Sequence, residues 1–524
     1  MATRYTRFSH DRKRRTAAGN APGDGQRRRM PVASGPVGAL AETVSAARPA
    51  PAPESPSEPA RRPWQKAPRG NVREPAVSGR SETAGTATPT DAPADVPQAR
   101  TRRQLVLMLF LFSLVIPLKF HAGPLLLTPY RLVLLVAIIP LFAIWVSGRA
   151  GRIFGIDFLI FAFVLWIAVT LLVNHGLSQF ELIAITAIET LGGFLAGRVL
   201  VRNRQDFDVL IRALTIIMLL FVPAAILESL TGIRVFAKIA DMIGQTHPWV
   251  HASGKYEQRL GMYRSQMVFE HPILFGVFAA SAFGLLYYAN RNGGRGIMGW
   301  RRAWMPAVAT FFSLSSGAYL ALIAQIGLVT WDKLMHGVRH HWKILLGLGI
   351  LAYVVVDLLS NRTPIEVFIS YAAFSAHNGY MRINIFNFGM DNVWAHPVFG
   401  LGMNDWVRPR WLHAASVDNF WLLMAMRHGF PGFLLIAAAF LGTIIRLSSL
   451  KVRDPWIAHQ RTGLMVVLVG LVFVLMTVHV WGAVYVFVCF LLGAGVWLRD
   501  YARDEAAVKP AGEPAPHNRA GARR

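Results

Sequence analysis

The sequence predicts an all-α polytopic membrane protein with about twelve transmembrane helices, a large outer loop between the ninth and tenth helices, and a disordered N-terminal tail. Of the 524 residues, 53% are hydrophobic and only 16% are charged, and the apolar residues fall in blocks long enough to cross a bilayer. The connections between these blocks are alternately rich and poor in Lys and Arg. By contrast, the first hundred residues contain few large apolar side chains.

Apolar blocks follow one another from Gln104 to residue 498. One stretch, 303–331, is interrupted by small polar residues at Ser313 and Ser316, so it forms either one long helix or two short ones. The predicted spans are 104–119, 125–147, 154–173, 180–200, 209–230, 267–288, 302–315, 316–332, 342–359, 417–444, 461–478 and 479–498.

The charge of the connections favours two helices in the ambiguous stretch. With twelve spans and the N-terminus inside, every short inner connection is basic, whereas the short outer ones hold only Lys119 and, at 174–179, no Lys or Arg. Merging the two helices would move the Arg446–Arg461 connection outside. The positive-inside rule therefore predicts twelve spans with both termini in the cytoplasm, in a multi-pass protein of the bacterial inner membrane.

The two ends of the chain are predicted to be cytoplasmic tails, over 1–103 and 499–524. The first is rich in Ala, Pro, Gly, Ser and Arg and lacks periodicity and a signal-peptide pattern, so it is expected to be disordered. The formal net charge of +25 resides in this tail and in short loops, which suits contact with anionic membrane lipids and argues against nucleic acid as a partner. A single cysteine, Cys489, excludes an intrachain disulfide.

Two longer segments, 231–266 and 360–416, are predicted on the outer face. Both contain aromatic, Gly, His and charged residues, and long ordered loops in a compact protein are usually functional. Within the second, Ile383, Phe386 and Met390 have helical spacing, which indicates a helix lying at the membrane surface.

Candidate site residues gather in and after these segments. Arg264 precedes the sixth span and can line a site or extend to the lipid headgroups; His271 precedes Pro272 and is equally explained as a helix start. In the second segment Arg382 is suited to binding phosphate, whereas Arg408 and Arg410 are better explained as solvated loop residues.

His413 and Asp418 lie where the chain re-enters the membrane, a location that suits a general base, although Asp418 is also typical of a helix N-cap. Charged residues within the spans are functional candidates by default, and Glu189 is the deepest, positioned to pair with a neighbouring helix. The pair Asp206 and Asp208 is best explained as a solvated charge cluster. No phosphate-binding loop and no HExxH motif occur, and neither a metal site nor a cofactor is predicted.

Several motifs, in their order and placement relative to the spans, resemble the O-antigen ligase and polymerase family over about 104–498. They are Arg264 with Phe269-Glu-His-Pro272, Phe312-Ser-Leu-Ser-Ser-Gly-Ala-Tyr-Leu, Arg382 with Trp394-Ala-His-Pro-Val-Phe-Gly-Leu-Gly402, and Asp418-Asn-Phe-Trp-Leu with Arg427-His-Gly429-Phe-Pro-Gly432.

The resemblance implies a membrane glycosyltransferase that takes a glycan from a polyprenyl (undecaprenyl) pyrophosphate carrier and passes it to an acceptor hydroxyl at the periplasmic face. It implies that Arg264 and Arg382 hold the pyrophosphate and that a loop residue activates the acceptor. A flippase and a chain-length regulator are the partner proteins expected for such an enzyme. Fixed guanidinium groups can stabilise a leaving pyrophosphate without a metal.

One position departs from the ligase pattern. Ligases of this family generally have His-Asn before the tenth span, where this chain has Asp418-Asn419. The base is therefore Asp418, His413 or neither, and Asn419 is expected to orient the loop. The departure favours a Wzy-type polymerase of O-antigen or exopolysaccharide over a ligase acting on the lipid A core. A secondary transporter is the alternative of another class, but no internal repeat is found.

Overall fold

The structure is a computed structural model that describes residues 96–122, 125–242, 258–289, 300–371, 376–413 and 415–507. The predicted tail falls almost entirely outside these ranges. Helix α1 begins at Val96, so the predicted boundary at Gln104 lies inside a helix. At the other end, α18 (Trp497–Ala507) makes the first part of the predicted C-terminal tail helical.

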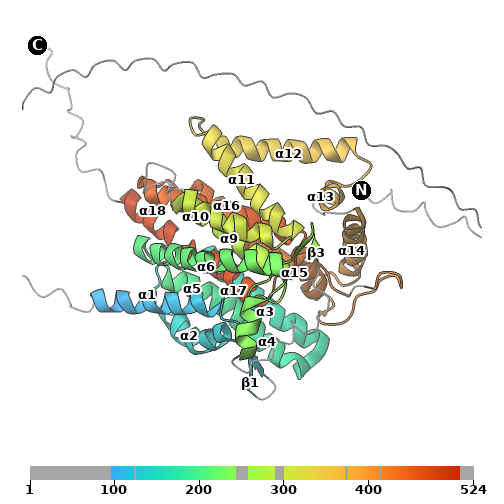
Figure 1. Ribbon diagram of the computed structural model, residues 1–524, viewed down its shortest axis with the longest axis horizontal. Helices are drawn as coiled ribbons and strands as arrows, with labels where there is room; N and C mark the ends of the chain where they lie inside the picture. The colour runs from blue at the N-terminus through green and yellow to red at the C-terminus, as the bar shows by residue number, and fades with distance from the viewer. Residues whose placement is uncertain are drawn as a thin grey trace, which may run out of the picture. The chain divides into compact units, whose positions relative to one another are not determined.

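Each of the twelve predicted spans contains helix in the structure, and the stretch around Ser313 forms two helices (Figure 1). The helices in these ranges are α1 (Val96–Ser113), α2 (Pro129–Val146), α3 (Gly155–His175), the pair α4 (Phe180–Ala187) and α5 (Gly193–Leu200), α6 (Arg204–Thr231), α9 (Pro272–Ala289), α10 (Trp300–Phe312), α11 (Ser316–Leu334), α12 (His341–Leu359), α15 (Phe420–Ser449), α16 (Pro455–Leu475) and α17 (Gly482–Ala494). A single π-helical turn, η2 (Ile188–Gly192), joins α4 to α5, and a 3-10 turn, η1 (Gly176–Gln179), precedes α4.

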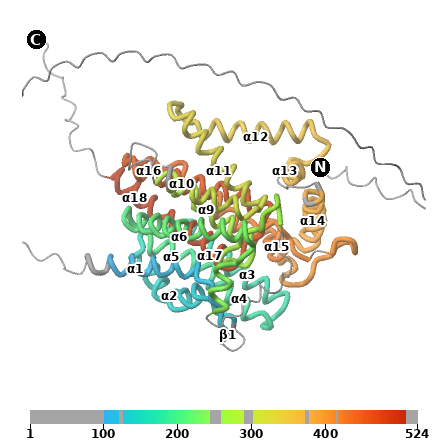
Figure 2. Tube along the Cα trace, viewed as in Figure 1, coloured from blue at the N-terminus to red at the C-terminus, as the bar shows by residue number. Residues whose placement is uncertain are grey.

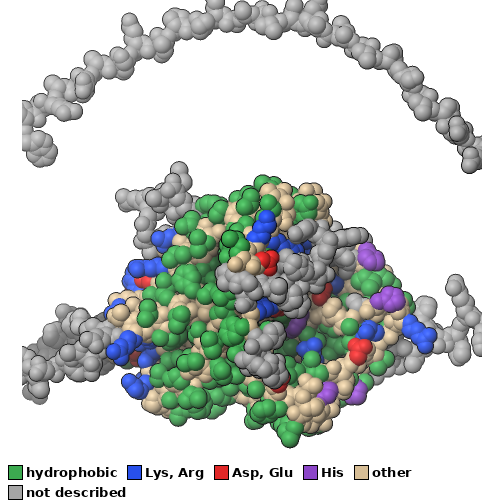
Figure 3. Space-filling model, turned by 60° about the horizontal axis from the view of Figure 1, so that its bottom comes forward, with side chains coloured by type: hydrophobic (Ala, Val, Ile, Leu, Met, Phe, Trp, Pro, Cys, Tyr) green, Lys and Arg blue, Asp and Glu red, His purple; other side chains and the backbone are tan. Residues whose placement is uncertain are grey.

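Eight helical stretches in the described part of the chain are long and apolar enough to cross a membrane. On the face drawn in Figure 3, hydrophobic side chains form a broad band, with Lys and Arg gathered at one margin and a mixture of charged and His side chains at the other. Such an apolar exterior requires lipid as its solvent. The protein is therefore a multi-pass helical membrane protein, while the number of spans and their orientation stay predictions.

The centre of the bundle is formed by α9, α16 and α17, whose side chains are mostly buried. Figure 2 shows the α9 trace passing through the middle of the bundle beside α6 and α10. Against α17 lies α5, and glycines at their crossing allow close backbone approach: a Cβ on Gly493 would lie 2.1 Å from the carbonyl oxygen of Phe194. Small residues at helix crossings are the usual means of packing helices in membranes.

One end of the bundle is closed by buried ion pairs. The Arg198 guanidinium lies 3.3 Å from the Asp157 carboxylate, and both side chains are almost completely buried; Asp157 also accepts a hydrogen bond from the Trp145 indole at 3.1 Å. Asp157 lies in the first turn of α3, where it is buried against Arg198. At the same end, Asp206 pairs with Arg103 at 2.8 Å.

The opposite end, which we call the loop end, carries the segments between α6 and α9 and between α12 and α15. The first contains α7 (Val235–Met242) and the hairpin of β3 (Gln258–Arg259) and β4 (Met262–Tyr263). The second contains α13 (Pro364–Tyr371) and α14 (Ala376–Ala395), so the helix predicted from the spacing of Ile383, Phe386 and Met390 is confirmed. A further hairpin pairs β1 (Phe120–Ala122) with β2 (Leu125–Leu127).

The crossing of α5 and α17 gives a prediction. Gly493→Ala should destabilise the protein by several kcal/mol, since the added methyl group overlaps backbone that belongs to another helix. The matched control is Gly442→Ala on α15, where nothing lies within 4 Å of the added Cβ. Thermal unfolding of the purified variants measures the difference, and equal melting temperatures would contradict the packing described.

Candidate functional site

The start of α15 is held in place on both sides. Asn419 caps the helix, because its Oδ1 accepts a hydrogen bond from the Leu422 amide at 3.0 Å. The Phe420 amide donates to the carbonyl of Val478, in the connection between α16 and α17, at 3.3 Å. These bonds fix Asp418 directly before the helix begins, while the part of Asn419 in orienting the loop stays a prediction.

Arg264 lies in a segment that is bonded to two helices. The Ser265 amide donates to the Phe312 carbonyl at 3.0 Å and its hydroxyl to the Ala225 carbonyl at 2.7 Å. The next amide, of Gln266, donates to the Glu228 carboxylate at 3.1 Å. With its backbone held on α6 and on the end of α10, the Arg264 side chain is only 6% exposed. Headgroup contact, the alternative considered for it, needs an exposed side chain.

Arg382, on α14, lies within electrostatic range of Asp418. The Arg382 guanidinium has a buried Nη1 with no hydrogen-bond partner among the described residues. Desolvation lowers the pKa of Arg382, an effect that the nearby Asp418 charge opposes. Desolvation also raises the pKa of Asp418, and the positive charge of Arg382 offsets only part of that increase.

Arg259 joins these residues and was not anticipated from the sequence. Its Nη1 donates to the Leu314 carbonyl at 3.2 Å, in the turn between α10 and α11. It lies within electrostatic range of Arg382 and, together with Arg264, within range of Tyr319. We call Arg259, Arg264 and Arg382 the arginine cluster. The β3–β4 hairpin, which turns at Leu260 and Gly261, connects the first two of them.

The two predicted histidines lie outside this arrangement. His413 is exposed, and no described contact joins it to Asp418 or Arg382. His271 acts as a helix start: its Nδ1 accepts a hydrogen bond from the Ile273 amide at 3.1 Å. Its neighbour Glu270 pairs with Lys119 at 2.6 Å. Of the six candidate site residues, the structure therefore brings Arg264, Arg382, Asp418 and Asn419 to one region, with His271 and His413 apart.

Glu189 pairs with a neighbouring helix, as predicted. Its carboxylate lies 2.8 Å from Arg131 and accepts a hydrogen bond from the Tyr130 hydroxyl at 3.0 Å, both on α2. Within the described ranges no group of three or more His, Cys, Asp and Glu side chains is placed to hold a metal ion.

The sharp break in α15 is stabilised by the preceding loop. Gly429 has left-handed backbone angles and Pro431 has no amide hydrogen, so the helix cannot satisfy its own carbonyls there. Instead, the Leu401 amide donates to Met426 at 2.7 Å and the Gly402 amide to Arg427 at 2.9 Å. In return, the Phe430 amide donates to the Pro397 carbonyl at 2.8 Å. Residues 397–402 thus complete the hydrogen bonding of α15.

Fold and site together define a polytopic helical membrane protein with a cationic cluster at the loop end and the Asp418 carboxylate within electrostatic range of Arg382. Residues 302–437 match the O-antigen ligase family, in agreement with the motifs. The matched segment contains Arg382, Asp418 and Asn419. Arg264 precedes the segment and is not covered by the match. A comparison with curated proteins gives no match.

The family supplies the broad function. It supports a glycosyltransferase-type enzyme of the inner membrane that processes a lipid-linked glycan in polysaccharide biosynthesis. The members of the arginine cluster come from segments far apart in the chain, and the family match covers only Arg382 of the three.

The bonds at the α15 break give a second prediction. Gly400 has a φ of 65°, and a Cβ there would lie 2.4 Å from the Arg427 carbonyl carbon. Gly400→Ala should therefore destabilise the protein by about 2 kcal/mol or more, through backbone strain and overlap. Gly347→Ala, on α12 with nothing within 4 Å, is the control. Melting temperatures compare the two, and an unaffected Gly400 variant would rule out the described close approach.

Proposed function

We propose that this protein is a polymerase that joins polyprenyl-pyrophosphate-linked oligosaccharide repeat units into O-antigen or exopolysaccharide at the periplasmic face of the inner membrane. The observation that carries the proposal is that three arginines from distant segments gather at the loop end. Arg259 lies within electrostatic range of Arg382, Arg259 and Arg264 lie within range of Tyr319, and Asp418 is the carboxylate that acts on Arg382. Guanidinium groups gathered in this way suit the oxygens of a pyrophosphate group.

In the proposed reaction, one carrier-linked glycan is the donor and a second is the acceptor. An acceptor hydroxyl oxygen forms a bond to the anomeric carbon of the donor, and the bond from that carbon to the pyrophosphate oxygen breaks. Asp418 takes the proton of the attacking hydroxyl. The carrier pyrophosphate departs with the bonding electron pair, and Arg264 and Arg382 stabilise the negative charge that it gains.

Asp418 suits the base better than His413. The carboxylate stands beside an arginine whose buried Nη1 has no hydrogen-bond partner among the described residues, and desolvation raises its pKa, which makes it a stronger base than an ordinary aspartate. The Asp418-Asn419 sequence, in place of the His-Asn of ligases, favours a polymerase. A ligase that transfers a finished glycan to the lipid A core is the second candidate, favoured by the description of the matching family.

Both termini are proposed to be cytoplasmic, which places the loop end in the periplasm. A flippase would deliver the donor to that side, and a chain-length regulator would set the number of units joined. In the proposed mechanism the guanidinium groups supply the positive charge at the leaving group, so no metal or cofactor is included.

Replacing the two candidate pyrophosphate ligands tests the proposal. Arg264→Ala and Arg382→Ala should each lower polymer formation by about 100-fold or more, because each removes a charged donor aimed at the leaving group. Arg410→Ala, in an exposed part of the same segment, should leave it unchanged. Glycan length is followed on gels of cells in which the chromosomal copy is replaced by each variant.

The gel pattern separates the candidates. Loss of long chains with single repeats still attached supports the polymerase. Loss of attachment, with carrier-linked polymer accumulating, identifies a ligase instead. Unchanged glycan in both arginine variants would contradict both enzymatic functions, the polymerase and the ligase.

The proposed base predicts a pH dependence. Asp418 must be deprotonated to accept a proton, so activity should fall as the pH decreases through its pKa. Because that pKa is raised, the fall should begin above the range of an ordinary aspartate, whose pKa is about 3.9. A pH–rate profile of the purified enzyme with carrier-linked repeat units measures it. Asp418→Asn should lose activity by about 100-fold or more, and His413→Ala should keep both activity and profile; the reverse result would assign the base to His413.

A further inference from the structure

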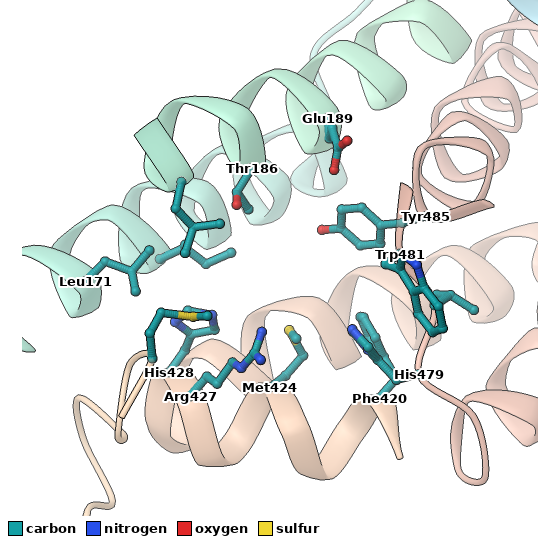
Figure 4. A pocket seen from close by; sticks show the side chains of 14 residues that line it. Leu171, Thr186, Glu189, Phe420, Met424, Arg427, His428, His479, Trp481 and Tyr485 are labelled. Carbon is teal, nitrogen blue, oxygen red and sulfur yellow. The ribbon is translucent and has the colours of Figure 1, made fainter. Parts of the chain in front are cut away.

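A pocket that combines apolar and charged side chains lies inside the bundle, next to the start of α15 (Figure 4). Its walls are α3, α4, η2, α15 and the connection before α17, and its volume is about 130 Å³. Phe420, two residues after Asp418, lines it, so the pocket adjoins the candidate base. The charged and titratable side chains on its walls are Glu189, Arg427, His428, His479 and Tyr485.

Most of these polar groups already have an ion-pair or hydrogen-bond partner within the protein. Glu189 is neutralised by Arg131, and the Tyr485 hydroxyl lies 2.8 Å from that of Thr190. The Nδ1 of His428 lies 2.7 Å from the Thr170 hydroxyl. None of the three is available to balance a further positive charge.

Arg427 is different. Figure 4 shows its side chain pointing into the pocket, and in the described part of the chain no carboxylate or hydrogen-bond partner meets its guanidinium group. The imidazole of His479, in the connection before α17, lies within electrostatic range of Arg427 and has a buried Nδ1 that also lacks a hydrogen-bond partner among the described residues. A charge withdrawn from water without a counter-ion is costly, and a guanidinium fork with an imidazole nitrogen beside it matches the oxygens of an anion.

The backbone holds Arg427 in this position. Its carbonyl accepts the hydrogen bond of Gly402, and the break at Gly429 follows two residues later. The guanidinium is therefore presented from a fixed point about two helical turns beyond Asp418. The pocket has the volume of a few water molecules, which suits one small anionic group.

We propose that the Arg427 pocket binds an anionic oxygen group, a phosphate or a carboxylate, of the second glycan substrate, separately from the arginine cluster that holds the donor pyrophosphate. The assignment to the second substrate rests on the proposed function; anion binding at Arg427 does not. A polymerase has two carrier-linked substrates, so a second anion site is what its acceptor requires. Phosphate would come from the carrier of that acceptor, and carboxylate from an acidic sugar in the repeat unit.

The test uses the full-length protein purified in detergent, in the double variant Arg264→Met/Arg382→Met, in which the arginine cluster is disabled. Thermal unfolding is recorded with sodium pyrophosphate and, separately, with sodium glucuronate, because a ligand that binds only the folded state raises the melting temperature. At least one of the two anions should stabilise the double variant. Adding Arg427→Met should weaken its binding at least tenfold, whereas Arg427→Lys should retain part of it and Arg410→Met all of it.

The result also identifies the source of the anion. Stabilisation by pyrophosphate supports the carrier phosphate, and stabilisation by glucuronate supports an acidic sugar. If neither anion stabilises the double variant, the pocket holds only water and the proposal is overturned. If the Arg427→Met protein does not fold, Thr186→Phe fills the pocket from the opposite wall and should abolish the same binding while Arg427 is kept; undiminished binding in that variant would also overturn it.

A last measurement links the pocket to the glycan. Arg427→Met in otherwise normal protein should shorten the polymer on gels, and unchanged length would overturn the assignment to the second substrate. This result differs from a failure of the proposed function. If the protein is not a polymerase or ligase, the glycan is unchanged in the Arg264 and Arg382 variants, whatever the Arg427 pocket binds.

Discussion

The exchange of backbone hydrogen bonds between residues 397–402 and α15 is the interaction on which the site depends. In an apolar environment every amide and carbonyl must find a partner within the protein, so a helix can break only where another segment replaces the missing bonds. Gly429 and Pro431 create the break, and the amides of Leu401 and Gly402 replace the bonds. Two separate motifs of the sequence are therefore two halves of one arrangement, which fixes the position of Arg427.

The two ends of the bundle treat buried charge differently. At the end with α18, the deeply buried Arg198 has its counter-charge in Asp157, and Asp206 is matched by Arg103. Such matched pairs are structural. At the loop end, Arg382 has Asp418 within electrostatic range, whereas Arg427 lies in its pocket without a carboxylate beside it among the described residues. A protein bears the cost of that imbalance where a ligand supplies the missing charge.

Much of the fold could be predicted because lipid imposes a simple pattern on the sequence. Apolar blocks marked the helices, and the small residues near Ser313 divided α10 from α11. The spacing of Ile383, Phe386 and Met390 was sufficient to predict that α14 is a helix. Boundaries were less accurate: α1 begins before Gln104, since the polar first turns of a helix that extends beyond the membrane carry no apolar signal.

The site could be predicted only in part, because its composition depends on contacts between distant segments. Arg264 and Arg382 were recognised from motifs, but Arg259 belongs to the cluster through a hairpin that no local pattern marked. Arg427 is part of a motif, but the motif does not show whether a carboxylate pairs with it. In the structure the carboxylate of its pocket, Glu189, pairs with Arg131 instead. Similarly, no local pattern marks the burial of Asp157, which depends on its partner Arg198, 41 residues further along the chain.

Helix α12 has no buried residue, although it is apolar along its length, and it lies apart from the main bundle (Figure 1). Protein packing therefore contributes little to its placement, and acyl chains must be its principal neighbours. Solubilisation exchanges those neighbours for a micelle. The chain between α11 and α13 should consequently be the first part to change its arrangement on extraction, so lipid nanodiscs are the better medium in which to study the intact molecule.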